Sequence, residues 1–145
     1  MNRKKKEFFE KDGWTFVETL IVMAIVLVMT ASVGFSSIKQ LDKARVVTAK
    51  SQIDAFSIAL ESYYMDVGNY PSEQDGLDCL WDKSFCNSDK WNGPYVTKQI
   101  PKDPWGNDYV YLCPGRNGLP WTIVSYGKDS MEGGEGYDGD ITSDE

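Results

Sequence analysis

Residues 16–35 read FVETLIVMAIVLVMTASVGF and carry a single charge, that of Glu18. A helix of about 20 residues is about 30 Å long, which matches the thickness of the hydrocarbon core of a bilayer. Residues 1–13 precede this stretch with five bases and three acids. Because basic residues favour the cytoplasmic side of a membrane, we predict a single-pass span with the N-terminus inside and the rest of the chain outside.

The basic leader is not arranged like an ordinary secretory signal, whose cleavage site follows its apolar segment. Here the candidate junction, Gly13–Trp14, comes before the apolar segment. Cleavage at this junction would remove the leader and leave the apolar helix on the mature protein.

Glu18 places a carboxylate near the start of the span, where an ionised group costs a few kcal/mol. Two interpretations stay open at this point. Glu18 either reaches the lipid headgroups of a simple signal anchor, or pairs with the α-amino group that cleavage exposes on Trp14 of a neighbouring subunit.

A second helical pattern follows the span. Apolar side chains recur in steps of three and four, and Gly68–Asn69 provides a natural stop. We expect one helix from about Trp14 to about Val67, apolar all round over residues 14–36 and amphipathic over residues 37–67. The amphipathic stripe suits packing against the chain's own C-terminal part, with a coiled coil as the alternative. Its members are Val46, Ala49, Ile53, Phe56, Leu60, Tyr63 and Val67.

Residues 68–145 are rich in Gly, Pro, Asn and aromatic residues, which is typical of loops and short strands. We expect strands at Tyr109–Leu112 and Trp121–Ser125, a turn at Pro114–Pro120 and a short helix from Gln74 to Trp81. The predicted fold class is α+β, with a long N-terminal helix packed against a small antiparallel sheet. Four aromatic side chains are expected to pack in this sheet rather than bind a ligand: Trp105, Tyr109, Tyr111 and Trp121.

The composition argues against several classes of function. The chain has 22 acids, 15 bases and no histidine, which gives a net charge of -7. An acidic chain is a poor ligand for nucleic acid, and the absence of histidine removes the commonest general base. No phosphate-binding loop or nucleophile motif occurs, so we do not expect an enzyme.

Three cysteines are present, at positions 79, 86 and 113. Outside the cytoplasm a disulfide is permitted, and Cys79 and Cys86 are the easiest pair to join because they lie close in sequence. Three reduced thiols are the alternative.

The segment Asp129–Asp140 reads DSMEGGEGYDGD, with five acids among glycines. Oxygen ligands without His or Cys suit a hard cation, calcium above magnesium. The spacing differs from that of an EF-hand. A solvated acidic loop is the alternative to this metal-binding loop.

The run Gly13-Trp14-Thr15-Phe16-Val17-Glu18 resembles the processing signal of type IV pilins and type II secretion pseudopilins, with Trp14 where Phe is usual. The resemblance implies cleavage after Gly13 by a prepilin peptidase and N-methylation of Trp14. It also implies that Glu18 contacts the neighbouring N-terminus during assembly.

The C-terminal part resembles the major pseudopilins of type II secretion, and residues 78–93 follow their pattern least. The similar stretches are Gly68-Asn69-Tyr70-Pro71, Glu73-Gln74, Gly76-Leu77, Pro101-Lys102-Asp103-Pro104-Trp105-Gly106-Asn107-Asp108-Tyr109 and Ser125-Tyr126-Gly127.

In those proteins a C-terminal loop binds calcium. By position, the resemblance implies carboxylate ligands from Asp129 and Asp140 and main-chain carbonyl ligands from Tyr126 and Met131. Gly139 stands where many members have a second acid, and we infer that Asp138 substitutes for it.

The leading hypothesis is a structural subunit of a periplasmic pseudopilus that helps to export folded proteins. Its expected partners are further copies of itself, minor pseudopilins, the inner-membrane secretion platform, the prepilin peptidase and the membrane. The alternatives are a type IV pilin for adhesion or DNA uptake, and a signal-anchored calcium-binding module that never polymerises. We expect domains at residues 1–13 (cleaved leader), 14–36 (span and filament core), 37–67 (amphipathic helix) and 68–145 (head with calcium loop).

Overall fold

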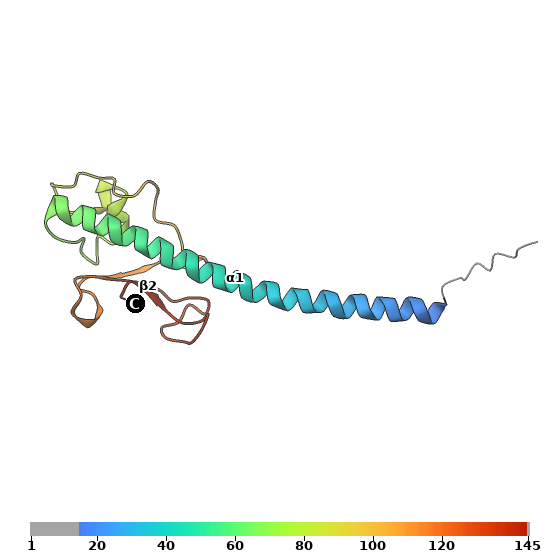
Figure 1. The fold of residues 1–145 in the computed structure, drawn as a ribbon. Helices are drawn as coiled ribbons and strands as arrows, with labels where there is room; N and C mark the ends of the chain where they lie inside the picture. The colour runs from blue at the N-terminus through green and yellow to red at the C-terminus, as the bar shows by residue number, and fades with distance from the viewer. Residues whose placement is uncertain (1–14, 145) are drawn as a thin grey trace, which may run out of the picture. The chain divides into compact units, whose positions relative to one another are not determined.

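The computed structural model describes residues 15–144, with the side chains of residues 32–38 excepted. Contacts divide the chain into two compact units, Met1–Lys39 and Gln40–Glu145, each of which is described by itself. Helix α1 (Phe16–Val67) contributes residues to both units. Figure 1 shows the chain coloured along its length, with the strands and loops of the second unit beside the green part of α1.

The ends of α1 follow from its sequence. Thr15 precedes the helix, and its Oγ1 accepts a hydrogen bond from the backbone N–H of Glu18 at 3.3 Å, as an N-cap does. The C-terminal end lies at Val67, because Gly68 adopts a φ of 89° and its N–H closes the last turn on the carbonyl of Tyr64 at 2.8 Å. The predicted end of the helix is confirmed.

The core of the second unit forms on the predicted face of α1. Ala49, Ile53, Phe56, Leu60, Tyr63 and Val67 are all buried, Val46 is partly buried, and Ala59 joins the same cluster. The rings of Phe56 and Tyr109 meet edge to face with their centroids 5.4 Å apart. The stripe therefore packs against the chain's own strands and loops, as predicted.

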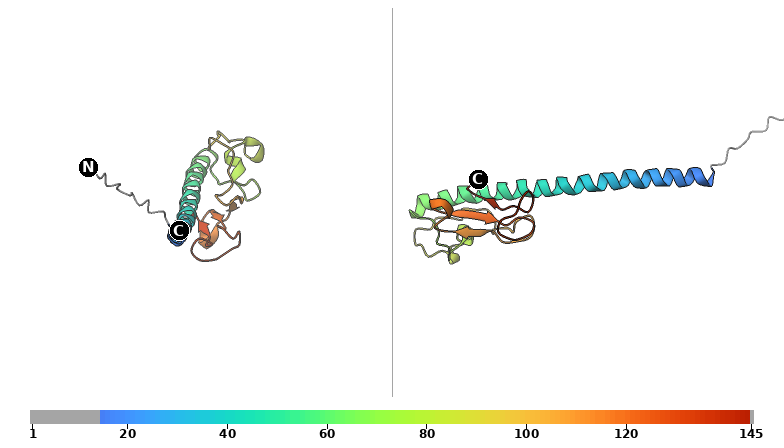
Figure 2. Two further views of the ribbon diagram at one scale, coloured as in Figure 1. Left: turned by 90° about the vertical axis from the view of Figure 1, so that its right-hand side faces the viewer. Right: turned by 90° about the horizontal axis from the view of Figure 1, so that it is seen from below.

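The sheet is small and antiparallel, in the order β1-β2-β3, with β1 at Val110–Leu112, β2 at Thr122–Ser125 and β3 at Ile141–Thr142. Tyr111 pairs with Ile123, and Ser125 pairs with Ile141. The central strand β2 is buried along its whole length. In Figure 2 the strands lie beside the same part of α1 from two further directions.

The first two strands lie within the predicted ranges, and the turn between them contains the short 3-10 helix η3 (Arg116–Gly118). Strand β3 was not predicted, since two residues are too few to show an alternating pattern. Of the four aromatic side chains, Tyr109 and Tyr111 are buried, whereas Trp105 and Trp121 pack against the core from its edge. The α+β class is confirmed.

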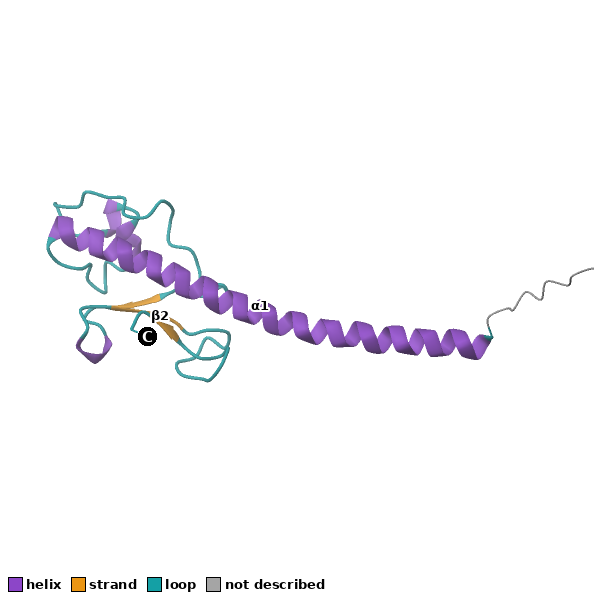
Figure 3. Ribbon diagram, in the orientation of Figure 1, coloured by secondary structure: helices purple, strands orange, loops and turns teal. Residues whose placement is uncertain are grey.

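The remainder of the second unit is mostly loop, as the teal segments of Figure 3 show. The helix expected from Gln74 to Trp81 is wrong in extent, because only a 3-10 turn, η1 (Leu77–Leu80), forms there. A second 3-10 turn, η2 (Lys83–Phe85), follows. Cys79 and Cys86 form a disulfide across these two turns, with their Cα atoms 4.9 Å apart, and Cys113 is a free thiol.

Candidate functional site

The first candidate site is the beginning of α1. Gly13 and Trp14 lie outside the described residues, so the predicted junction and methylation site have no structural counterpart. Glu18 is exposed and lies in the first turn of the helix. A negative side chain in the first turn interacts favourably with the helix dipole and so stabilises the helix. The sequence Thr15-x-x-Glu18 also matches a capping box. The hydrogen bond from the N–H of Glu18 to Oγ1 of Thr15 is one half of that motif. Sequence analysis missed this local role of Glu18.

The surface of this part of α1 is apolar. From Phe16 to Met29, eleven large apolar side chains are exposed, from 41% at Val22 to 79% at Phe16. They fall on every side of the helix because they include the consecutive residues 20–23 and 25–29. Over the side chains described, residues 15–31 and 39–144, no helix has a stretch both long enough and apolar enough to cross a membrane.

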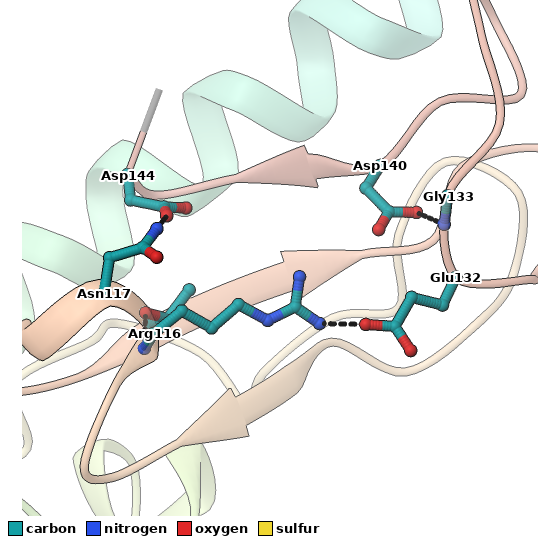
Figure 4. A network of polar contacts seen from close by, with 7 residues as sticks. Arg116, Asn117, Glu132, Gly133, Asp140 and Asp144 are labelled. Atoms are coloured by element: carbon teal, nitrogen blue, oxygen red, sulfur yellow. Dashed lines mark hydrogen bonds and ion pairs between the residues drawn. The ribbon is translucent and has the colours of Figure 1, made fainter.

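The second candidate site is the acidic loop, residues 129–140, which leaves the end of β2 and returns as β3. Its first and last acids hold its backbone. Asp129 Oδ1 accepts the N–H of Met131 at 3.1 Å, and Asp140 Oδ1 accepts the N–H of Gly133 at 3.0 Å. Each bond uses one of the two carboxylate oxygens, and a carboxylate has further lone pairs for a ligand. Figure 4 shows the bond between Asp140 and Gly133.

Two glycines allow the backbone of this loop to turn back on itself. Gly127 has a φ of +64°, and a Cβ there would lie 2.8 Å from the carbonyl oxygen of Gly139. Gly134 has a φ of +91°, and a Cβ there would lie 2.4 Å from the carbonyl oxygen of Asp138. Any other residue would meet both a strained φ and a clash. The two glycines therefore allow the backbone at positions 127 and 134 to pass close to the main-chain carbonyl oxygens of Gly139 and Asp138.

The β1–β2 turn contacts both the acidic loop and the residues after β3. Arg116 Nη2 donates to Glu132 Oε1 at 2.9 Å, and Asn117 Nδ2 donates to Asp144 Oδ2 at 3.3 Å, as Figure 4 shows. The pKa of the Asp144 carboxyl is lowered, chiefly by a hydrogen bond from Thr142 and further by Asn117 and the charge of Arg116. Two adjacent residues of η3 thus contact one acid within the acidic loop, Glu132, and one acid after β3, Asp144.

A third contact connects α1 to Lys128, the residue directly before the loop. Lys128 Nζ donates to Asp42 Oδ2 at 3.1 Å, and Arg45 Nη1 lies 3.6 Å from Asp42 Oδ1. Asp42 is buried. Sequence analysis missed this group, although two signals were present: Asp42 precedes Val46 by one helical turn on the core stripe, and Lys128 is the last base in the chain.

The donors of the acidic loop fit a hard cation in type. Asp129 and Asp138 are exposed and Asp140 is half-buried, and carboxylate and carbonyl oxygens are the ligands that calcium takes. Among the described residues, no group of three or more His, Cys, Asp or Glu side chains is placed to hold a metal ion. The participation of the main-chain carbonyls of Tyr126 and Met131 stays a prediction.

A cavity lies between this loop and α1. Its volume is about 400 Å³, and it is lined by Val46 and Lys50 of α1, by the loop glycines 133, 134, 136 and 139, and by Asp140 and Ile141. The inner side of the loop is therefore accessible to small ions.

Comparison with known proteins identifies the family. The family "Type II secretion system (T2SS), protein G" matches residues 36–144. The type II secretion system core protein G of Pseudomonas aeruginosa is 39% identical over 134 residues, which cover 91% of this chain and 94% of the relative. The corresponding protein of Vibrio cholerae is 36% identical over 139 residues, covering 94% and 93%.

A solved structure agrees with these relatives. The major pseudopilin of the type 2 secretion system of enterohaemorrhagic Escherichia coli superposes with a TM-score of 0.59 and 31% identity, covering 73% of this chain and 91% of that one. The resemblance inferred from the processing signal and the Asp-Pro-Trp-Gly stretch is thereby confirmed. The chain belongs to the type II secretion system protein G family, and it is a structural pseudopilin rather than an enzyme.

Proposed function

We propose that this pseudopilin is held in the inner membrane through residues 14–36, with its C-terminal part in the periplasm, and that it polymerises there into a pseudopilus through the same helix. The observation that carries the proposal is the apolar surface between Phe16 and Met29, which is exposed on all sides. Burial of eleven such side chains is worth on the order of 10 kcal/mol. In water such an exposed apolar surface would favour aggregation. Lipid would cover it before assembly, and other copies of the chain would cover it afterwards.

The order of charge and apolar sequence supports the orientation. The five bases of residues 1–13 precede the apolar stretch, and seven acids with no base lie from Asp129 to Glu145. Positive residues remain on the cytoplasmic side, so the acidic head would lie in the periplasm. The disulfide between Cys79 and Cys86 is compatible with that compartment.

Processing would convert the anchored form into the assembling form. We infer cleavage after Gly13 by a prepilin peptidase and N-methylation of Trp14. The exposed carboxylate of Glu18 would then meet the new N-terminal ammonium of a neighbouring copy. An acid that is costly in lipid becomes favourable once an opposite charge lies beside it. The capping interaction with Thr15 uses the backbone N–H of Glu18 and leaves this role open to its carboxylate.

We further propose that the acidic loop binds one calcium ion through Asp129 and Asp140, the carbonyls of Tyr126 and Met131, and Asp138. The support is the chemistry of these donors, since carboxylate and main-chain carbonyl oxygens are the ligands that calcium takes. When bound, calcium would neutralise acids that otherwise repel one another, and so would stabilise the loop and strand β3. The minor pseudopilins and the inner-membrane platform are the expected partners of the assembled filament.

The mature N-terminal mass tests the proposal as a whole. Protein purified from an actively secreting culture should lack residues 1–13 and begin at Trp14 with one added methyl group. A variant with Gly13→Leu should retain the leader and stay in the membrane without filaments. An intact leader on wild-type protein recovered from sheared pseudopili would contradict the proposed processing.

A further inference from the structure

The face of α1 opposite the core carries two sets of three exposed side chains, each with an apolar residue between two charged ones. The basic set is Lys43, Val47 and Lys50, and the acidic set is Asp54, Ile58 and Glu61. Charge of the two signs is separated along the helix, because residues 43–50 include no acid and residues 51–67 include no base. The two apolar members are 60% and 70% exposed.

The two sets have the same internal spacing. Each member of the basic set lies 11 positions before its counterpart in the acidic set. Eleven residues make three helical turns plus about 20° and extend about 16 Å along the axis, so counterparts point in nearly the same direction. A second α1, parallel to the first and displaced by about 16 Å, would therefore bring three pairs together at once. These pairs are Lys43 with Asp54, Val47 with Ile58 and Lys50 with Glu61.

We propose that this face of α1 is a contact surface for a second copy of this chain, in which the basic set of one copy packs against the acidic set of the next. The inference rests on the polymerisation proposed above and names one of its contacts. Each copy would offer its basic set to one neighbour and its acidic set to another, so the contact is heterologous and continues from copy to copy. Parallel copies without the displacement would instead place like charges opposite each other, which opposes association.

The direction of the second copy follows from the apolar pair and from the membrane anchor. In an antiparallel arrangement Lys50 would face Asp54. Val47 would then face Ser57 instead of Ile58, and the apolar pair would be lost. Copies that enter one membrane through the same segment, with their basic leaders on the same side, also run in the same direction. The parallel arrangement is therefore the one proposed.

The surroundings of these residues are compatible with the contact. The hydroxyl of Tyr70 donates to Oε1 of Glu61 at 2.9 Å, and a carboxylate has further lone pairs for a second donor. Ala44 and Ala55, which are exposed and again 11 positions apart, flank the two sets. Small side chains at a helix contact allow the two axes to approach closely.

Exchange of charges tests the pairing in cells that produce each full-length variant as their only copy. Lys50→Glu and Glu61→Lys should each lower the yield of sheared pseudopili about tenfold, because each places like charges opposite each other. Lys50→Glu/Glu61→Lys re-forms the pair with its signs exchanged and should assemble within about threefold of wild type. Lys90→Glu, the same reversal at an exposed loop residue outside α1, should assemble as wild type does.

The outcomes separate this inference from polymerisation itself. Normal yields from both single variants, or no rescue by the double variant, would overturn the contact while polymerisation stands. Rescue by Lys50→Glu/Asp54→Lys instead would indicate antiparallel packing and would overturn the parallel register. Absence of filaments from wild type would defeat polymerisation and this inference together. The melting temperature of each variant in detergent micelles establishes that it folds.

Cysteine cross-linking tests the register without changing a charge. In a chain that carries Cys113→Ser, Val47→Cys/Ile58→Cys should form disulfide-linked multimers when assembled pseudopili are oxidised with copper phenanthroline, because a disulfide requires closely opposed Cβ atoms. Val47→Cys/Ser57→Cys, the pair that an antiparallel contact would bring together, should remain monomeric. Multimers from the second pair alone, or from neither pair, would overturn the proposal.

Discussion

The hydroxyl of Ser125 donates a 2.7 Å hydrogen bond to Oδ2 of Asp103, and both residues are buried. The other oxygen of the same carboxylate accepts the N–H groups of Trp105 and Asn107 at 3.0 and 2.8 Å. One acid thus closes the Asp-Pro-Trp-Gly turn on itself and ties it to β2. This arrangement explains why the stretch needs an aspartate at position 103.

Replacing Asp103 should therefore be costly. Asp103→Ala should lower the free energy of unfolding by about 2–4 kcal/mol, because it leaves two partly buried N–H groups and a buried hydroxyl without their acceptor. Chemical denaturation followed by tryptophan fluorescence measures this change. Asp108→Ala is the control in the same loop: Asp108 pairs with Lys102 at 3.0 Å, but both side chains are mostly exposed, so the cost should stay below about 1 kcal/mol.

Glu18→Leu should leave membrane insertion intact and abolish assembly. The substitution makes the span more apolar, which favours insertion, but it removes the proposed counter-charge for the neighbouring N-terminus. Membrane fractionation measures insertion, and electron microscopy of sheared filaments measures assembly. Thr19→Leu, an uncharged polar-to-apolar change at the next position, should still assemble. Normal filaments from Glu18→Leu would refute the pairing role.

Calcium removal should destabilise the acidic loop. Chelation should lower the melting temperature of the wild-type chain by several degrees, since about 1 kcal/mol of bound-ion stabilisation shifts the melting temperature of a domain of this size by about 4 °C. Asp129→Ala and Asp140→Ala should reduce stability in calcium and change it much less in chelator. Asp89→Ala, an exposed acid outside the loop, should respond to calcium as wild type does. An unchanged melting temperature of wild type on chelation would exclude a stabilising ion.

Reduction of the disulfide should loosen the loop at residues 79–86. The entropy of closing an eight-residue loop corresponds to roughly 2–3 kcal/mol, which Cys79→Ser/Cys86→Ser should remove from the free energy of unfolding. In denaturant, a maleimide should label one thiol, that of Cys113, before reduction and three afterwards. Labelling of three thiols in protein that has never been reduced would contradict the pairing. Cys113→Ser should keep the disulfide and abolish the single label.

The chain should lose stability at alkaline pH. Burial raises the pKa of both Tyr109 and Tyr111 well above the ordinary value near 10, and the neighbouring Asp103 and Cys113 respectively add to the rise. The hydroxyl of Tyr111 donates to the carbonyl of Pro71 at 2.9 Å. A raised pKa in the folded state means that the contribution to stability is complete below about pH 10 and is lost as the pH rises towards the folded-state pKa.

Denaturation at a series of pH values measures this loss. Each buried tyrosine should contribute a slope of about 1.4 kcal/mol per pH unit above pH 10. Tyr111→Phe should be less stable at neutral pH by about 1 kcal/mol but should show a shallower alkaline slope. Tyr137→Phe, on the exposed loop, should retain the wild-type slope. An identical slope in Tyr111→Phe would show that this tyrosine does not titrate on unfolding.

Much of the fold could be predicted because its signals are local. The spacing of Ile53, Leu60 and Val67 defines one helix face, and Gly68 ends the helix through a conformation that suits glycine. The strands around Tyr111 and Ile123 followed from β-favouring residues between turn residues. Strand β3 could not be found in this way, because its two residues become a strand through pairing with Val124 and Ser125.

The same distinction applies to the candidate site. Its residue types could be predicted from the sequence, since acids among glycines after Gly127 suggest oxygen ligands for a hard cation. Its ion pairs could not be predicted, because Arg116 meets Glu132 and Asp42 meets Lys128 only after the strands and α1 have packed together.

The amino-acid sequence by itself determined the apolar first half of α1, the amphipathic second half and the acidic character of the C-terminal loop, because each depends on the order of neighbouring residues. The tertiary structure decided which charges meet. Asp42 and Lys128 are 86 positions apart, and no periodicity extends over that distance. Their contact exists because packing on the core stripe buries the carboxylate where the loop begins, and a buried charge requires an opposite charge beside it.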